Sequence, residues 1–124
     1  MVEIVGYRTV YKNLSYYCGP GPAVVCDGEG RLVVGFRRVL SWLVYGFRFE
    51  EGYGVRARVL SAECDEVGEE IVLRDDGAVA DLGYPDACLL PDGRVMVVYY
   101  TNQRQDAPDS TAPRFIEACF LGEK

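Results

Sequence analysis

Short apolar runs alternate with turn residues along the whole chain. Val, Tyr, Phe and Leu dominate the runs, and Gly, Pro, Asp and Asn separate them. Runs of this length and composition are typical of β-strands. The pattern predicts an all-β fold with eight strands, at residues 5–12, 23–26, 31–39, 55–62, 70–74, 87–90, 94–101 and 114–121. Around residues 39–47 a helix is a second interpretation.

One segment of the chain occurs twice. Residues 22–34 and 85–97 are variants of each other, because five positions of the first return 63 positions later as the same or a similar residue. These positions are Pro22, Gly30, Arg31, Leu32 and Val34, which return as Pro85, Gly93, Arg94, Val95 and Val97. Each copy reads as a β-hairpin with a glycine in its tight turn. We therefore predict one domain, 1–124, built from two four-stranded units at about residues 13–64 and 70–124.

The predicted order places the longer connections together. An antiparallel meander reverses at every turn, so the two tight hairpins emerge at one end and four long connections at the opposite end. Those four connections are residues 13–21, 40–54, 75–84 and 102–113. Insertions gathered on one face of a repeat protein usually mark a binding face. The alternative is that these loops are insertions that the fold tolerates and that have no binding role.

The charge and hydrophobicity of the chain restrict the kinds of partner that we expect it to bind. The chain has 124 residues, 49% of them hydrophobic, and its 13 basic and 19 acidic residues give a net charge of −6. The basic residues are scattered, which argues against nucleic-acid binding, where neutralising phosphate dominates affinity. No apolar run approaches the ~20 residues of a membrane span, and no signal peptide is recognisable at the start. We expect a cytoplasmic protein without membrane partners.

The cysteines give no sign of a metal or disulfide site. There are five, none in a Cys-x-x-Cys spacing, and the chain has no histidine, so we expect no metal and no cofactor. Cys26, Cys88 and Cys119 lie in apolar runs and are interpreted as small buried hydrophobes. Cys18, beside Gly19, is the candidate reactive thiol.

Several segments resemble a known family. In the second copy they are residues 71–77 (IVLRDDG), 81–85 (DLGYP), 90–94 (LPDGR), 97–100 (VVYY) and 115–118 (FIEA). In the first copy they are residues 9–12 (TVYK), 30–33 (GRLV) and 36–38 (FRR). Together they resemble blades of the sialidase (neuraminidase) superfamily of β-propellers. The chain departs from that family in having length for two blades rather than about six, and in lacking the Asp-box turn, since residues 61–68 read SAECDEVG.

The blade count suggests an assembly. Two blades cannot close a ring and would leave sheet edges and an apolar flank uncovered. We therefore expect a homo-oligomer, with three chains supplying six blades and strand 5–12 completing the last blade beside residues 114–121. The alternative is a small β-sandwich built from the same strands, which needs no partner.

The resemblance also implies candidate site residues. Sialidase chemistry uses three arginines that bind a carboxylate, a tyrosine nucleophile helped by a glutamate, and an aspartate acid/base. The matching candidates at the expected loop face are Arg37, Arg38, Arg74, Asp75, Asp76, Asp81, Tyr84 and Tyr100. Tyr99 and Tyr100 must face opposite sides of one strand, so at most one of them can face a pocket. Most blades that build the family's pocket are missing, so we expect no catalytic residue.

One connection is unusually apolar. Residues 40–47 read LSWLVYGF, and Trp42, Tyr45 and Phe47 are interpreted as an interface with another subunit or as packing.

Three functional hypotheses follow from the sequence. The first is a non-catalytic module that binds a carbohydrate or a small acidic ligand on the long-loop face. The others are a protein-interaction or structural role, including a folded remnant, and a reduced glycoside hydrolase.

Overall fold

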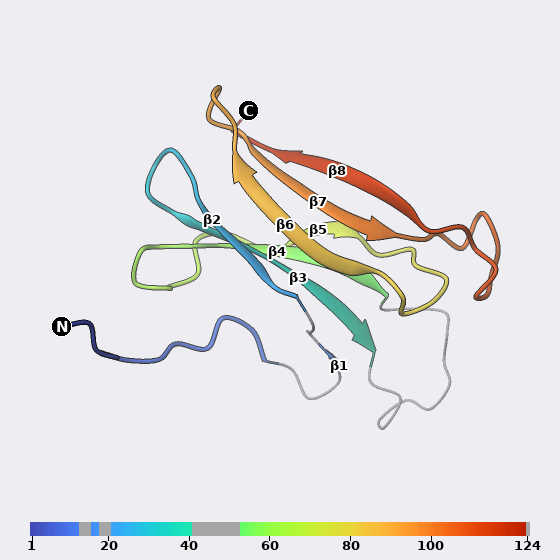
Figure 1. Cartoon of the computed structure of the whole chain (residues 1–124), viewed down its shortest axis with the longest axis horizontal. Helices are drawn as coiled ribbons and strands as arrows, with labels where there is room; N and C mark the ends of the chain where they lie inside the picture. The colour runs from blue at the N-terminus through green and yellow to red at the C-terminus, as the bar shows by residue number, and fades with distance from the viewer. Residues whose placement is uncertain (13–15, 18–20, 41–52, 124) are drawn as a thin grey trace.

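The computed structural model describes residues 1–12, 16–17, 21–40 and 53–123, and within them the fold is all-β without a helix (Figure 1). Two antiparallel sheets are present, and neither closes into a barrel. The first contains β1 (Tyr16–Tyr17), β2 (Ala23–Cys26), β3 (Leu32–Leu40), β4 (Gly54–Leu60) and β5 (Ile71–Arg74). The second contains β6 (Gly83–Leu89), β7 (Val95–Thr101) and β8 (Phe115–Leu121).

From β2 to β5 and from β6 to β8, strands that follow one another along the chain are neighbours in their sheet. β2 pairs with the first half of β3, and β1 pairs with the last two residues of β3. β4 and β5 then extend the first sheet, and β6, β7 and β8 form the second in the same manner. The all-β prediction is therefore confirmed, and the hairpins at residues 27–30 and 91–93 connect β2 with β3 and β6 with β7.

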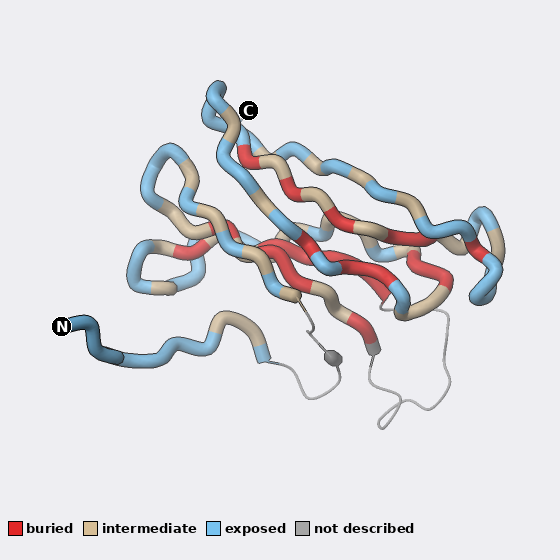
Figure 2. Tube along the Cα trace, viewed as in Figure 1, coloured by how far each residue is buried: buried red, intermediate tan, exposed pale blue. Residues whose placement is uncertain are grey.

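The core lies between the two sheets, where β6 packs against β2 and β3 (Figure 2). Alternate residues of β7 point into it, since Val95, Val97, Tyr99 and Thr101 are buried while the residues between them are not. This is the side-chain period of a strand with one face on the core. The rest of the buried apolar cluster is Val33, Val39, Tyr53, Val55, Ala57 and Leu82.

A glycine lets the sheets approach closely. A Cβ at Gly35 on β3 would lie 3.4 Å from the Cβ of Pro85 on β6. Because Gly35 lacks that atom, the proline ring fills the space above β3. Pro85 is one of the positions shared by the two copies, and here it is buried, whereas Pro22 in the first copy is exposed.

Two of the connections predicted at the loop face lie within the described residues, and both are at one end of the molecule, as predicted. Residues 75–82 join the two sheets and residues 102–114 join β7 to β8, and both emerge at the right-hand end in Figure 1. The backbone N–H of Arg104 donates to the carbonyl oxygen of Asp76 over 2.9 Å, which connects the two loops directly. The tight hairpins and the end of β8 lie at the opposite end.

The predicted strand at residues 5–12 is wrong. This segment pairs with no strand in the described part of the chain, and it contacts the outer face of the first sheet. There the Tyr11 ring packs against Phe36 with centroids 4.8 Å apart, and Arg58 Nη1 donates to the Val10 carbonyl over 3.2 Å. A segment held on a sheet face has no ladder partner, because such hydrogen bonds form only at an edge.

Other strand predictions differ in detail. Among the described residues the predicted second unit does not form one four-stranded sheet, because β5 pairs with β4 in the first sheet and leaves three strands in the second. The short β1 was not expected. β6 begins at Gly83 rather than at residue 87, because it continues through a register shift between Gly83 and Asp86. Pro85 lies within that shift, where a ladder donor is not needed.

Gly54 provides a test of the first sheet. A Cβ at this position would overlap the backbone carbonyl of Arg74, to which buried Arg56 also donates from Nη1 over 2.9 Å. We expect Gly54→Ala to lower the free energy of unfolding by about 1–3 kcal/mol, as overpacking does elsewhere. Urea denaturation measures this loss. Gly28→Ala is the matched control, because nothing lies within 4 Å of its added methyl group. An equal loss of stability in both variants would contradict the close contact between Gly54 and the Arg74 carbonyl.

Candidate functional site

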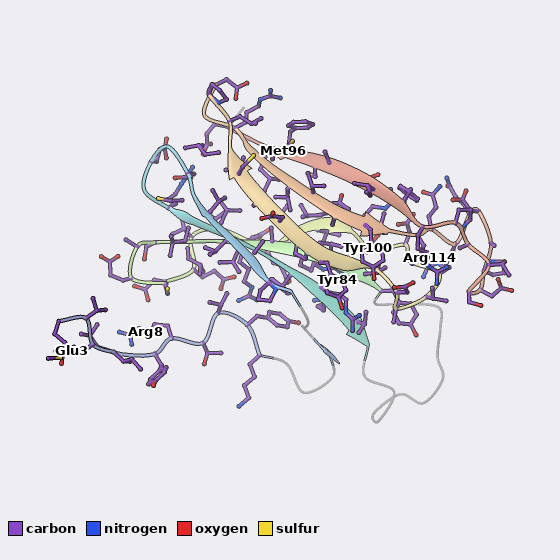
Figure 3. The ribbon with its side chains drawn as sticks, in the orientation of Figure 1. Glu3, Arg8, Tyr84, Met96, Tyr100 and Arg114 are labelled. Carbon is purple, nitrogen blue, oxygen red and sulfur yellow. The ribbon has the colours of Figure 1, made fainter. Side chains whose placement is uncertain are left out.

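Two tyrosines and three charged residues gather at the end that carries the long connections. The rings of Tyr84 and Tyr100 stack with centroids 5.7 Å apart and planes 21° from parallel. The Tyr100 hydroxyl donates to Asp81 Oδ1 over 2.5 Å, and Arg114 Nε donates to Asp81 Oδ2 over 3.0 Å (Figure 3). Arg37 Nη1 donates to the carbonyl of the residue preceding Asp81 over 3.1 Å. We call Arg37, Asp81, Tyr84, Tyr100 and Arg114 the tyrosine cluster.

The start of β6 turns Tyr84 outward. Gly83 has φ +112° and Tyr84 has φ +47°, and a tyrosine with positive φ is uncommon. A Cβ at Gly83 would lie 2.9 Å from the Cβ of Arg37, so the glycine allows the arginine stem to pass beneath the turn. The Tyr84 side chain is left 53% exposed, with one ring face against Tyr100.

A buried asparagine positions the loop that carries Asp81. Asn102 is fully buried, and its Oδ1 accepts hydrogen bonds from the backbone N–H groups of Ala78 at 2.6 Å and Val79 at 3.1 Å. Its Nδ2 donates to the carbonyls of Val79 at 3.3 Å and Asp81 at 3.0 Å. One side chain thus supplies four of the hydrogen bonds of residues 78–81, replacing the ladder that a strand would provide.

The cluster is a carboxylate held by cationic and phenolic donors. The Tyr100 phenol and then the Arg114 guanidinium, through their hydrogen bonds, hold the pKa of Asp81 below its ordinary value. The same hydrogen bond, followed by burial, raises the pKa of Tyr100 to about 12. At neutral pH Tyr100 is therefore a neutral donor and Asp81 a charged acceptor. With Arg37 and Arg114 the cluster carries one net positive charge in a chain of net charge −6.

A second polar cluster surrounds Arg74. Its guanidinium contacts Asp76 Oδ2 at 3.1 Å, Gln103 Oε1 at 2.5 Å and Glu117 Oε2 at 3.2 Å. The Tyr99 hydroxyl donates to Glu117 Oε1 over 2.7 Å, so a tyrosine–glutamate pair beside an arginine does exist. However, Tyr99 is only 2% exposed, and burial followed by the hydrogen bond to Glu117 raises its pKa. This pair connects β7 with β8, and its tyrosine is buried while the Glu117 side chain is partly exposed.

The structure brings together part of the predicted site. Arg37, Asp81, Tyr84 and Tyr100 meet in the tyrosine cluster, and Arg74 with Asp76 forms the second cluster.

The remaining predicted residues lie elsewhere. Arg38 points to the opposite face of β3, where its Nη1 lies 3.7 Å from Glu70 Oε2, because neighbours on a strand alternate. Asp75 is exposed. The predicted interface residues Trp42, Tyr45 and Phe47 lie outside the described residues.

Sequence reasoning missed Arg114 and Asn102. Arg114 directly precedes β8, and Asn102 directly follows β7, so both are at the ends of the strands beside the long connection. Their positions at the ends of the strands that flank a long connection are the sequence signal by which they could have been identified as site residues.

A hollow lies at the opposite end of the sheets. It has a volume of about 390 Å³ and an apolar wall that includes Val33, Val95 and Leu121. Arg31 lies at its rim, where its Nε contacts Asp27 Oδ2 at 2.7 Å and its Nη2 contacts Glu123 Oε1 at 3.0 Å. The hollow is therefore separate from the tyrosine cluster.

The expectation for the cysteines is partly wrong. Cys26 and Cys88 are exposed, since each stands at a strand position that faces away from the core, while Cys119 is half-buried. Burial raises the pKa of the Cys119 thiol. Cys18 lies outside the described residues. In the part of the chain that the structure describes, no three Cys, Asp or Glu side chains gather as metal ligands would, and no helix could span a membrane.

The comparisons with known proteins give one structural relative. No family model and no curated protein matches the chain. A crystal structure of a protein of unknown function from Dyadobacter fermentans is similar, with a TM-score of 0.64 and 29% sequence identity. The match covers 91% of this chain but 27% of that one, so the two-sheet fold recurs as about a quarter of a longer protein.

Asn102 can be tested by truncation. Asn102→Ala leaves the backbone N–H groups of buried Ala78 and half-buried Val79 without their acceptor, and we expect a loss of about 2–4 kcal/mol in the free energy of unfolding. Chemical denaturation measures the loss, and Gln105→Ala on the same connection is the control because Gln105 is exposed. A loss below about 1 kcal/mol, the net value of one ordinary hydrogen bond, would contradict the role given to Asn102.

The hydrogen bond between Tyr100 and Asp81 predicts a pH effect. The unfolded carboxyl titrates near 3.8 and the folded one lower, so its stabilising contribution is present above pH 3.8 and is lost as the pH falls through the folded pKa. We expect Tyr100→Phe to raise the pKa of Asp81 toward 3.8, measured by NMR titration of its carboxyl carbon. Tyr84→Phe is the control, because both hydrogen bonds to Asp81 remain. An unchanged Asp81 pKa in Tyr100→Phe would refute this cause.

Proposed function

We propose that this protein is a non-catalytic module that binds a carbohydrate or a small acidic ligand at the tyrosine cluster. The observation that carries the proposal is the stacked pair of Tyr84 and Tyr100, in which Tyr84 is about half exposed and Tyr100 shares Asp81 with Arg114. Tyrosine rings are large amphipathic surfaces on which the apolar face of a sugar can pack. The neighbouring carboxylate and guanidinium groups suit hydroxyl groups through charge-assisted hydrogen bonds.

The charge of the cluster favours an acidic ligand. Arg114 is partly exposed, and its Nη1 is oriented by the carbonyls of Ser110 at 2.8 Å and Ala112 at 2.7 Å. A planar guanidinium held in this manner is preorganised for a carboxylate. A sugar acid would combine both chemistries, because its ring would lie on Tyr84 while its carboxylate meets the arginines.

The burial of Tyr99, the tyrosine that pairs with Glu117, supports a non-catalytic role. A tyrosine nucleophile has to reach its substrate, and Tyr99, which pairs with Glu117, lies in the core. Tyr100 is more accessible, but its partner is Asp81 and its raised pKa keeps the phenol neutral. We also propose that the chain is related to the sialidase superfamily and that it is cytoplasmic. On this view the chain has a ligand-binding surface like that of the superfamily but lacks its hydrolytic activity.

A second candidate, a protein-interaction role through self-association, is supported by the outer face of the second sheet. One cross-strand row there is apolar and consists of Cys88, Met96 and Phe120, and the next row places Val98 and Ala118 beside Asp86. Phe120 is 51% exposed, and exposed apolar faces of this kind mark interaction sites. We propose that further copies cover this face in a homotrimer of six sheets.

Ligand binding can be tested by calorimetry with defined probes. We expect N-acetylneuraminic acid or glucuronic acid to bind more tightly than glucose or acetate, because only the sugar acids offer both a ring face and a carboxylate. Tyr84→Ala should weaken that binding at least about tenfold, equivalent to ~1.4 kcal/mol. Tyr7→Ala is the matched control, since Tyr7 is an exposed tyrosine remote from the cluster.

Two outcomes would reject the proposal. One is that no probe binds at about 10 mM, a concentration that would saturate a site of millimolar Kd. The other is that Tyr84→Ala and Tyr7→Ala bind the sugar acids equally well. Light scattering on the same samples reports the self-association candidate independently, because its result does not depend on the probes.

A further inference from the structure

β8 is an edge strand with apolar residues on both faces. It pairs with β7 on one side, and no strand in the described part of the chain pairs with its other side. Ile116 is 78% exposed and Phe120 51% exposed on the outer face. Phe115 and Leu121 lie on the inner face, where they are half-buried. An unpaired edge of this kind is a template for another strand, and a strand added here needs apolar residues on both of its faces.

Residues 2–9 have the composition of such a strand. They read VEIVGYRT, and their apolar side chains are among the most exposed of the described residues. Val2 is 100% exposed, Ile4 73%, Val5 94% and Tyr7 82%. In an extended backbone Val2 and Ile4 would lie on one face and Val5 and Tyr7 on the other. The segment therefore offers an apolar pair to each face of the sheet that it would join.

The segment is directed away from β8 of its own chain. Residues 10 and 11 are held on the outer face of the first sheet by Arg58 and Phe36. The second sheet packs on the opposite face of the first, so the whole first sheet separates this anchor from β8. Figure 3 shows Glu3 and Arg8 lying apart from the second sheet and its labelled residues. A second copy can supply the segment without releasing the anchor.

We propose that residues 2–9 of one copy add to β8 of a second copy as its fourth strand. The donated segment has eight residues and β8 has seven, so backbone hydrogen bonds can form along the full edge. Donor and acceptor are different surfaces, so the contact is head-to-tail and ends only when a ring closes. This inference specifies one contact of the self-association candidate above, and it is independent of ligand binding.

Light scattering on four samples tests the strand addition. The full chain is expected to exceed the 13.8 kDa mass of one copy. A variant lacking residues 2–9 keeps the acceptor edge, and a variant with Ile116→Lys and Phe120→Lys keeps only the donor, so each alone should be a monomer. An equimolar mixture of the two should give the mass of two chains and nothing larger. Val24→Lys is the control, because Val24 is 61% exposed on the first sheet, and it should assemble like the full chain.

A second measurement keeps the test valid if a variant folds poorly. A synthetic peptide of residues 2–9 added to the deletion variant should shift the amide resonances of residues 115–121 and leave those of β4 unchanged. The strand addition is overturned if the full chain is a monomer at about 100 μM, a concentration that populates complexes of micromolar Kd. It is also overturned if the deletion variant assembles like the full chain. That outcome would instead support association through the apolar sheet faces.

Discussion

The four hydrogen bonds of the Asn102 side chain are the constraint on which both the fold and the site depend. Residues 75–82, which connect the two sheets, run along the edge of the core and pair with no described strand. Buried peptide groups without hydrogen-bond partners lower the stability of the fold. Asn102 pairs with them from the end of β7, so the second sheet fixes the chain that leads into it. Asp81 emerges from this fixed segment toward Tyr100 and Arg114. The polar geometry of the surface is therefore set by a residue inside the molecule.

The strands of the core could be predicted because each carries its own signal. In β7 the alternation from Val95 to Thr101 and the turn at Gly93 define both faces and one end. Residues 5–12 carry the same kind of apolar run, yet they form no strand. A strand requires a free edge beside it, and Phe36 and Arg58 instead hold this segment on a sheet face. The availability of an edge is a property of the whole fold, which a local pattern does not contain.

The candidate site shows the same division between local and tertiary information. Tyr84 and Tyr100 could be predicted because both lie near strand ends at the loop face. Arg37 and Arg38 could not be separated until the register of β3 assigned each to a face. Arg114 is 33 positions from Asp81 in sequence, and its contact depends on how two long connections meet. Contacts between loops follow from the packing of the sheets, so the sequence indicates the region but not the partners.

Each sheet is built from consecutive strands, and this order affects synthesis on the ribosome. The first sheet is complete in sequence at Arg74, before any strand of the second has been made. Its inner face, with Val33, Val55 and Ala57, then has no cover until β6 and β7 emerge. Domains generally fold as units during translation, and apolar surface that is exposed before folding is complete favours aggregation. Until β6 and β7 have been synthesised, the apolar residues that face the second sheet therefore lack the partners that cover them in the folded protein.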